Sequence, residues 1–538
     1  MKSVMAHSFA QVPQVSIPRS TFNRDHGVKM PMDFDKLYPI FHDEMVPGDT
    51  AKLRVNAFGR LATPQFPIMD NMFIDTFFFA IPYRLVWENW QRFNGEQDNP
   101  DDSIDYLIPT QTSYPSTGYV YGELSDYFDI PPGVPDLEHS SLWHRAYNLV
   151  WNEWFRSESL QDSVPVPKGD GPDDPAQFAL LKRGKRFDYF TSCLPFAQKD
   201  FGQPVLLPLG DQAPLAGIAG AQTDGAAIAI ANSAGTNLGA INTSSSEKDL
   251  RSNVQSTIQS DVFYNNAGIQ TNFDGQAAYA DLTNATASTI NDLRLAFQIQ
   301  RMQERDARGG SRYIEIIKSH FGVTSPDFRL QRSEYLGGGS SRIGVNQVPS
   351  TVPTEIGNAP QGSLAAFGTV SIQGNGFTKS FTEHTLVIGL ACARADITYQ
   401  QGLDRMMSRS TRFDHYFPSF SHLGEQAILQ KEIFASGVPA EDDLVFGYNE
   451  RYAEMRYKKS SIRGIFRSSA PQSLDPWHLS QDFDNAPTLS SQFIEQNTPI
   501  ERAIALTDEP HIILDAFFKY KHARPLPTYG TPGMIDHF

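Results

Sequence analysis

An all-β fold is predicted from the composition of the chain and from the alternation of its apolar residues. The 538 residues include 37 Phe, 20 Tyr, 36 Pro and 39 Gly, which is typical of many short strands joined by tight turns and not of a helical bundle. With 40% hydrophobic and 20% charged residues, the chain can bury a large core, which excludes disorder throughout. The number of domains stays open, because a β-sandwich with long loops can hold many residues.

Four segments have the apolar pattern of β-strands. They are residues 52–61, 71–81, 385–395 and 512–520. The first alternates, with Leu53 and Val55 on one face, as in a half-buried strand. The second is apolar on both faces, as in a strand covered on both sides, and Pro82 ends it. Because strong strands occur towards both ends of the chain, we expect a Greek-key sandwich in which the terminal strands are neighbours.

Two segments have the spacing of helices. In residues 291–308, Leu295, Ile299 and Met302 follow the i, i+4, i+7 pattern and a Gly-Gly pair comes next, which predicts a helix with a stop. Residues 143–155 carry an aromatic stripe at the same spacing, which we interpret as packing and not as a binding site.

A segment of different composition lies between the first and second halves of the chain. From Gly210 to Ile290, 48 of 81 residues are Ala, Gly, Asn, Ser or Thr. One interpretation is a disordered linker, because small polar residues offer little surface to bury. Apolar residues such as Ile228, Val262 and Phe273 recur in it, however, and it is far too long for an ordinary loop between strands. We therefore favour an inserted, partly ordered surface projection.

Neither a membrane span nor a secretory signal is expected. The longest apolar run, residues 73–87, is interrupted by Asp75, Pro82 and Arg84, so it falls short of the roughly 18 apolar residues that a membrane helix needs. The N-terminal residues lack the apolar region of a secretory signal, which predicts synthesis in a cytoplasm. The two cysteines, Cys193 and Cys392, have apolar neighbours and are interpreted as buried small hydrophobic residues.

The common motifs of catalysis are absent from the sequence, including the P-loop, GxGxxG, GxSxG and HExxH. Neither His139 with His144 nor the run His42-Asp43-Glu44 has metal-ligand spacing with a further partner, so we interpret these residues as polar residues of the surface or of an interface. We expect no catalytic, cofactor-binding or metal site. Residues 337–341, Gly-Gly-Gly-Ser-Ser, can in principle hold an anion but are interpreted as a flexible turn.

One basic segment stands out in a chain of formal net charge −16. Its cations are Arg451, Arg456, Lys458, Lys459, Arg463 and Arg467. Only one carboxylate, Glu454, lies among them, and three aromatic residues interleave. Two interpretations stay open: contact with single-stranded DNA through phosphate pairing and base stacking, or ion pairs with carboxylates of neighbouring subunits. The acidic balance of the rest implies that any DNA contact is local. If the chain encloses a genome, we expect a separate small basic protein to neutralise most of its charge.

Several long blocks resemble one family of viral proteins. The sequence LYPIFHDEMVPGDTAKLRVNAFGRLATPQFPIMDNMFIDTFFFAIPYRLVWENW at 37–90 is similar to gokushovirus (Microviridae) major capsid proteins. So are RLQRSEYLGG at 329–338, ADITYQQGLDRMMSR at 395–409 and FDHYFPSFSHLGEQ at 413–426. VFGYNERYAEMRYKK at 445–459 and the closing HARPLPTYGTPGMIDHF also match. The blocks extend over the whole chain apart from the insert.

The resemblance implies a single eight-stranded viral jelly roll, an antiparallel β-sandwich with very long interstrand loops, a few short helices and one large loop insertion. Residues 1–209 are then the first part of a discontinuous shell domain with an N-terminal arm. Residues 210–290 form the inserted projection, a threefold protrusion and the candidate host-recognition region. Residues 291–538 complete the shell domain and end in a C-terminal arm.

By the same resemblance, the chain is the structural subunit of a bacteriophage virion, made in the bacterial cytoplasm. It assembles with itself, through pentamers, into a T=1 icosahedral capsid around a circular single-stranded DNA genome. Further expected partners are a small basic DNA-binding protein, a pilot protein, a scaffolding protein and a host surface receptor. Two alternatives are a β-sandwich carbohydrate-binding or carbohydrate-active protein, which stays a small oligomer, and a receptor-binding spike that forms free trimers.

Overall fold

The computed structural model describes residues 18–99, 101–197, 290–310, 312–324, 326–351, 362 and 364–529, together with short strands between residues 215 and 280. The chain forms two compact units, of which the first joins Met1–Gln198 with Asp306–Phe538 and the second is Lys199–Arg305. All of the long strands belong to the first unit.

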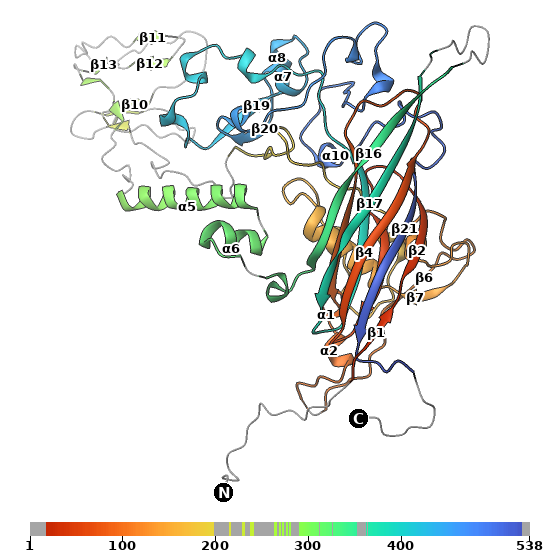
Figure 1. Cartoon of the computed structure of the whole chain (residues 1–538). Coiled ribbons are helices and arrows are strands. Elements are labelled where there is room, and N and C mark those ends of the chain that lie inside the picture. Colours follow the sequence, from red (N-terminus) through yellow and green to blue (C-terminus); the bar gives the residue numbers. More distant parts are fainter. Residues whose placement is uncertain are drawn as a thin grey trace, which may run out of the picture. The chain divides into compact units, whose positions relative to one another are not determined.

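Eight long strands of the first unit pair in nested order into two antiparallel sheets. The first sheet has the order β2 (His26–Met32), β21 (Ile512–Arg524), β4 (Thr50–Leu61) and β17 (Leu364–Ser380). The second has the order β3 (Tyr38–Met45), β18 (Thr385–Ala395), β5 (Met72–Pro82) and β16 (Glu334–Pro349). The first strand of this set pairs with the last, and the nesting continues inward to β5 with β16. Figure 1 shows the strands β2, β21, β4 and β17 of the first sheet side by side. The predicted jelly roll is therefore confirmed.

Two further pairings complete this framework. Strand β1 (Ser20–Asn23) extends the edge beside β2, because both strands pair with β21. The second half of β16 pairs with β17, so β16 takes part in both sheets.

The burial of each strand explains its sequence pattern. The main core lies between the two sheets and takes in alternate residues of β4, among them Leu53 and Val55. A second core covers the other face of the second sheet, where Leu386 and Ile388 pack while Val387 points into the main core. Strand β18 is buried on both faces, which accounts for its continuous apolar run. The first sheet has no such second layer among the described residues, so its strands alternate.

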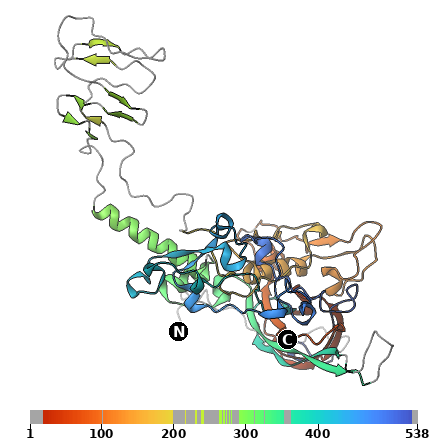
Figure 2. The same ribbon diagram turned by 90° about the horizontal axis from the view of Figure 1, so that it is seen from above.

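The second core is built largely by the long connection between β5 and β16. The part of this connection that precedes the second unit, residues 83–197, lies on one side of the sandwich, as Figure 2 shows from above. Helix α4 (Leu142–Val150) continues as a π-helical turn, η1 (Trp151–Phe155), and its aromatic stripe packs in this core as predicted. The other helices of the connection are α1 (Tyr83–Val86), α2 (Trp90–Phe93), α3 (Leu124–Tyr127), η2 (Pro175–Gln177), α5 (Ile290–Gly309), α6 (Tyr313–Phe321) and η3 (Asp327–Leu330). The predicted helix at 291–308 is confirmed by α5.

A third, smaller core lies under the connection between β18 and β21 and includes Phe190, Tyr399 and Ile428. Its strands are β19 (Glu425–Leu429) and β20 (Val445–Glu450), which form an antiparallel hairpin. The short helices of this connection are η4 (Arg405–Met407), η5 (Arg412–Asp414), η6 (Pro418–Phe420), α7 (Gln430–Ile433), α8 (Pro439–Asp442), α9 (Ala453–Arg456), η7 (Gly464–Phe466), η8 (Asp475–Trp477) and α10 (Ser491–Ile494). Both cysteines are free and buried, Cys193 in this third core and Cys392 in the second, as predicted.

The remaining strands are short and pair two by two. Strand β6 (Thr110–Thr112) pairs with β7 (Glu138–Ser140). In the second unit, β8 (Leu215–Ala216) pairs with β15 (Tyr279–Ala280), and β9 (Ala229–Ala231) pairs with β10 (Asn237–Ala240). Strand β11 (Phe263–Asn265) pairs with β12 (Gly268–Gln270), and β13 (Asn272–Phe273) pairs with β14 (Gln276–Ala277).

The interpretation of residues 337–341 as a flexible turn is wrong. These residues lie inside β16, paired with β5. The glycines are needed there because the backbones approach closely. A Cβ on Gly338 would overlap the carbonyl oxygen of Thr76, and Gly337 has a φ of 153° with the oxygen of Gly376 2.7 Å from the position of a Cβ. The glycines of this segment therefore reflect close packing between neighbouring strands and a β-bulge, and not a turn.

Candidate functional site

The basic segment follows β20, and its cations have different partners. Arg456 forms an ion pair with Glu450, and the Lys458 amine lies 3.0 Å from a carboxylate oxygen of Asp404. The Lys459 amine donates a hydrogen bond of 2.8 Å to the carbonyl oxygen of Glu432. Half of the segment is therefore engaged within the chain.

Lys459 is half-buried. Its amine lies 5.4 Å from the centre of the Phe190 ring, at the edge of the third core. Burial lowers the pKa of Lys459 below the ordinary lysine value, against the opposing effect of Asp404 and Glu432. Lys459 thus stabilises the local fold and presents little free charge to a ligand.

The other three cations have no carboxylate partner among the described residues. The Arg451 guanidinium donates to the carbonyl oxygen of Phe413, at 3.3 Å, and lies over the ring of Tyr452 at 5.1 Å. Arg463 and Arg467 are exposed at the two ends of η7. The charge that remains available in this segment is that of Arg451, Arg463 and Arg467.

The interpretation of the histidines as surface or interface residues is wrong for His144. His42 is exposed, whereas His139 is half-buried and His144 is fully buried. The rings of His139 and His144 are 5.4 Å apart, and each binds a hydroxyl: Tyr119 at 2.8 Å from His139 Nε2, and Ser125 at 2.9 Å from His144 Nε2. Burial lowers the pKa of His144 to about 3, which keeps the ring neutral. In the described part of the chain, no group of three His, Cys, Asp or Glu side chains is arranged to hold a metal ion.

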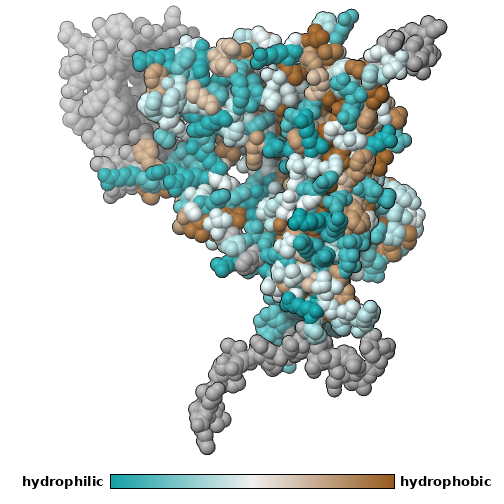
Figure 3. All heavy atoms as spheres, in the orientation of Figure 1, coloured by the Kyte–Doolittle hydropathy of each residue, from teal (hydrophilic) through white to brown (hydrophobic). Residues whose placement is uncertain are grey.

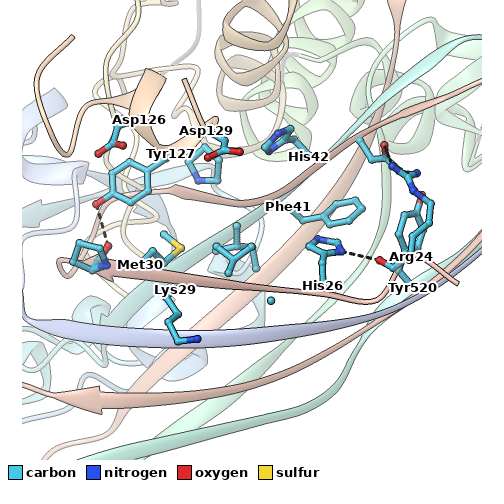
Figure 4. A pocket seen from close by; sticks show the side chains of 16 residues that line it. Arg24, His26, Lys29, Met30, Phe41, His42, Asp126, Tyr127, Asp129 and Tyr520 are labelled. Carbon is cyan, nitrogen blue, oxygen red and sulfur yellow. Dashed lines mark hydrogen bonds and ion pairs between the residues drawn. The ribbon is translucent and has the colours of Figure 1, made fainter. Parts of the chain in front are cut away.

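A cleft of about 700 Å³ lies at the open edge of the sandwich, between β2 and β3 (Figure 4). Several of its polar groups are engaged with one another. Arg24 forms an ion pair with Asp43, and the Tyr520 hydroxyl donates to the same carboxylate at 2.6 Å. The Tyr127 hydroxyl donates to the carbonyl oxygen of Pro31 at 3.0 Å. The contacts of Asp43 join β3 to the first sheet, and the contact of Tyr127 joins α3 to β2, which gives the cleft a structural role.

The chain enters and leaves the insert region at one hairpin. On the entry side, the Leu194 amide donates to the Tyr448 carbonyl of β20 at 2.7 Å, and the Tyr448 amide donates back at 2.8 Å. On the exit side, Arg308 forms an ion pair of 2.8 Å with Glu425 of β19. Most of the candidate host-recognition region, Gly210 to Ile290, lies outside the described residues. Both flanks of the insert region are thus attached to the β19–β20 hairpin of the first unit.

No helix among the described residues has both the length and the apolar character needed to cross a membrane.

Comparisons with known proteins cover nearly the whole chain. The family model described as "Capsid protein (F protein)" matches residues 10–534. The capsid protein VP1 of Bdellovibrio phage phiMH2K is 48% identical over 538 residues, which is 99% of this chain and 98% of the relative. The VP1 proteins of Chlamydia phage 1 and Spiroplasma virus 4 are 40% and 35% identical, over 99% and 98% of this chain and 98% and 97% of their own lengths.

These matches confirm the resemblance found in the sequence and do not favour the carbohydrate-binding alternative. A match of this length, together with the jelly roll, makes the chain a virion component. The chain belongs to the Capsid protein (F protein) family and is a major capsid protein of the gokushovirus type, the structural shell subunit of a small single-stranded DNA phage.

Proposed function

We propose that copies of this chain assemble through pentamers into a closed T=1 icosahedral shell around a circular single-stranded DNA genome, without any catalytic role. The observation that carries this proposal is the nested eight-stranded jelly roll in a chain that matches a capsid family almost from end to end. Closed symmetry multiplies modest contacts between identical subunits into a stable particle.

The test is to express the full chain and follow its assembly by sedimentation velocity and negative-stain electron microscopy. Closed uniform particles are the expected result, and stable pentamers support the same function while requiring a scaffolding protein. A persistent monomer, or a trimer that never closes, contradicts the proposal and points back to a small carbohydrate-binding protein or a spike.

We propose further that the insert, residues 210–290, is the projection that meets a host surface receptor. Two observations support it. The first and last described strands of the insert, β8 and β15, pair with each other, and the flanking segments attach to a single hairpin. A segment that joins the shell domain at one place can change in sequence and length without disturbing the fold of that domain.

For the basic segment, we propose that Arg451, Arg463 and Arg467 make the external contacts, either with DNA or with carboxylates of a neighbouring subunit. None of the three has a carboxylate partner among the described residues, and Arg463 and Arg467 are exposed, whereas Lys459 is enclosed beside the Phe190 ring. The formal net charge of −16 supports a small basic protein that neutralises most of the genome. A pilot protein and a scaffolding protein of the same phage complete the proposed set of partners.

A further inference from the structure

The outward face of the first sheet concentrates positive charge. Its strands alternate between core and solvent, so every second side chain of β2, β4 and β21 points outward. The outward-facing charged residues of these strands and β17 are Lys29, Lys52, Arg54, Arg60, Lys519, Lys521 and Asp515. Six cations thus stand against one carboxylate on this face, in a chain whose formal net charge is −16. We call it the basic sheet face.

The strand register places like charges directly opposite each other. Lys52 pairs with Lys521, and the next outward pair is Arg54 with Lys519. Like charges at directly opposed positions destabilise a sheet, because their side chains are close on the same face. Of the six cations on this face, only Lys29 has a carboxylate partner among the described residues. Its amine lies 3.7 Å from Asp515. No carboxylate among the described residues therefore offsets the repulsion within these two pairs, as on a face that binds a polyanion. Arg54 donates a hydrogen bond to the carbonyl oxygen of Gly374, at 3.3 Å.

Exposed aromatic rings lie beside these cations. Phe58 and Phe517 are 56% and 43% exposed on the same face. Phe58 is opposite Asp515, and Phe517 is opposite Asn56, so the two rings are diagonal neighbours in the register. Figure 3 shows hydrophilic and hydrophobic residues intermixed on the side of the molecule where β4 and β21 lie in Figure 1. Cations that track a phosphate backbone beside rings that stack on bases are the combination that single-stranded nucleic acid requires.

We propose that the basic sheet face binds the single-stranded DNA genome, with phosphates paired to Lys52, Arg54, Lys519 and Lys521 and with bases stacked on Phe58 and Phe517. The identity of the polyanion as the genome rests on the proposed function of the chain as a shell subunit. A second copy of this acidic chain is the competing occupant. The exposed rings favour DNA, because stacking uses unpaired bases in any sequence.

The test compares two full-length variants with equal loss of charge. The face variant carries Lys52→Gln, Arg54→Gln, Lys519→Gln and Lys521→Gln. The control variant carries Arg92→Gln, Lys168→Gln, Arg186→Gln and Lys318→Gln, four exposed cations of the first unit that lie outside the strands of this face. Binding of a fluorescent 30-nucleotide oligo(dT) to the unassembled chain is measured by anisotropy across a range of salt concentrations. Sedimentation velocity on the same samples records assembly.

The face variant should lower the slope of log binding constant against log salt by about 3, since each phosphate contact to a single strand contributes about 0.7. The control variant should keep the wild-type slope. The double variant Phe58→Leu with Phe517→Leu should keep the slope but weaken binding, by about tenfold for each ring.

Equal slopes in the face and control variants overturn the proposal. So does a face variant that keeps the wild-type slope but no longer assembles, which would make this surface a contact between copies. If the face variant is poorly soluble, the pair Lys52→Gln with Lys521→Gln removes one repulsive pair and should lower the slope by about 1.4. Failure of the wild-type chain to form pentamers or shells contradicts the proposed function separately, whatever the oligo(dT) result.

Discussion

Lys52 of β4 and Lys521 of β21 are direct cross-strand partners on the exposed face of the first sheet. Replacing Lys521 by Gln should raise the free energy of unfolding of the free subunit by about 0.2–1 kcal/mol, because it removes a like-charge pair. The gain should shrink at high salt, which screens the repulsion. Thermal unfolding at low and high salt measures both effects.

The matched control for this change is Lys431→Gln. Lys431 lies 2.6 Å from Asp443, so its neutralisation removes an attraction and should slightly lower stability. If both variants shift the melting temperature in the same direction, the assignment of repulsion between Lys52 and Lys521 is wrong.

Gly338 of β16 should tolerate no side chain. Its added methyl group would overlap the carbonyl oxygen of Thr76 on the neighbouring strand, so Gly338→Ala should cost about 1–3 kcal/mol or prevent folding. Gly344→Ala in the same strand is the control, since the nearest atom lies 3.8 Å from its Cβ position. Denaturant unfolding of the two variants compares them directly, and similar midpoints would show that β16 does not approach β5 so closely.

Acid should destabilise the subunit through His144. Burial lowers the pKa of this ring to about 3, from an ordinary value of 6.5. Between pH 6.5 and 3, His144 therefore binds a proton in the unfolded chain but stays neutral in the folded chain. The contribution of the neutral His144 ring to the free energy of unfolding is fully present above pH 6.5. It is lost as the pH falls from 6.5 towards 3, by up to about 1.4 kcal/mol per pH unit.

The measurement is the pH dependence of the unfolding free energy in His144→Gln against wild type. The variant keeps an amide for the Ser125 hydroxyl, and its curve should be flatter between pH 6.5 and 4. His422→Gln, at an exposed position, serves as the control and should leave the curve unchanged. A wild-type slope retained by the His144 variant would assign the effect to other buried groups.

The sequence predicted those strands whose apolar pattern is strong and local. Strands β4, β5, β18 and β21 were recognised because burial on one or both faces leaves a clear pattern in consecutive residues. Strand β16 was missed because its tight packing selects glycine, which resembles a turn in composition.

The interaction surfaces were harder to predict because they depend on distant residues. The basic segment looked continuous in sequence, but Asp404 and Glu432, which engage Lys458 and Lys459, lie outside it. The basic sheet face shows the reverse case. Its cations come from β2, β4 and β21, near opposite ends of the chain, and only the strand register brings them together.

The two kinds of cation in the basic segment should respond differently to charge reversal. Lys459→Glu places a carboxylate beside the Phe190 ring and the Glu432 carbonyl, so it should reduce the yield of soluble protein. Arg463→Glu with Arg467→Glu should fold normally, because both side chains are exposed. Loss of packaged DNA from intact shells would identify a DNA contact, and loss of shells would identify a subunit contact. Normal shells with normal DNA content would contradict both.

Removal of the insert should leave the shell intact. The flanking segments are attached to β19 and β20 through Leu194 and Arg308, so deleting residues 211–289 and bridging the ends keeps those anchors and the three cores. The expected result is soluble protein that forms shells but no longer attaches to host cells, measured by electron microscopy and a cell-adsorption assay. A matched deletion that also removes Arg308 should be less stable, because Glu425 then loses its partner. Insoluble protein from the first deletion would show that the insert is part of the folding unit, and full adsorption would show that another surface meets the receptor.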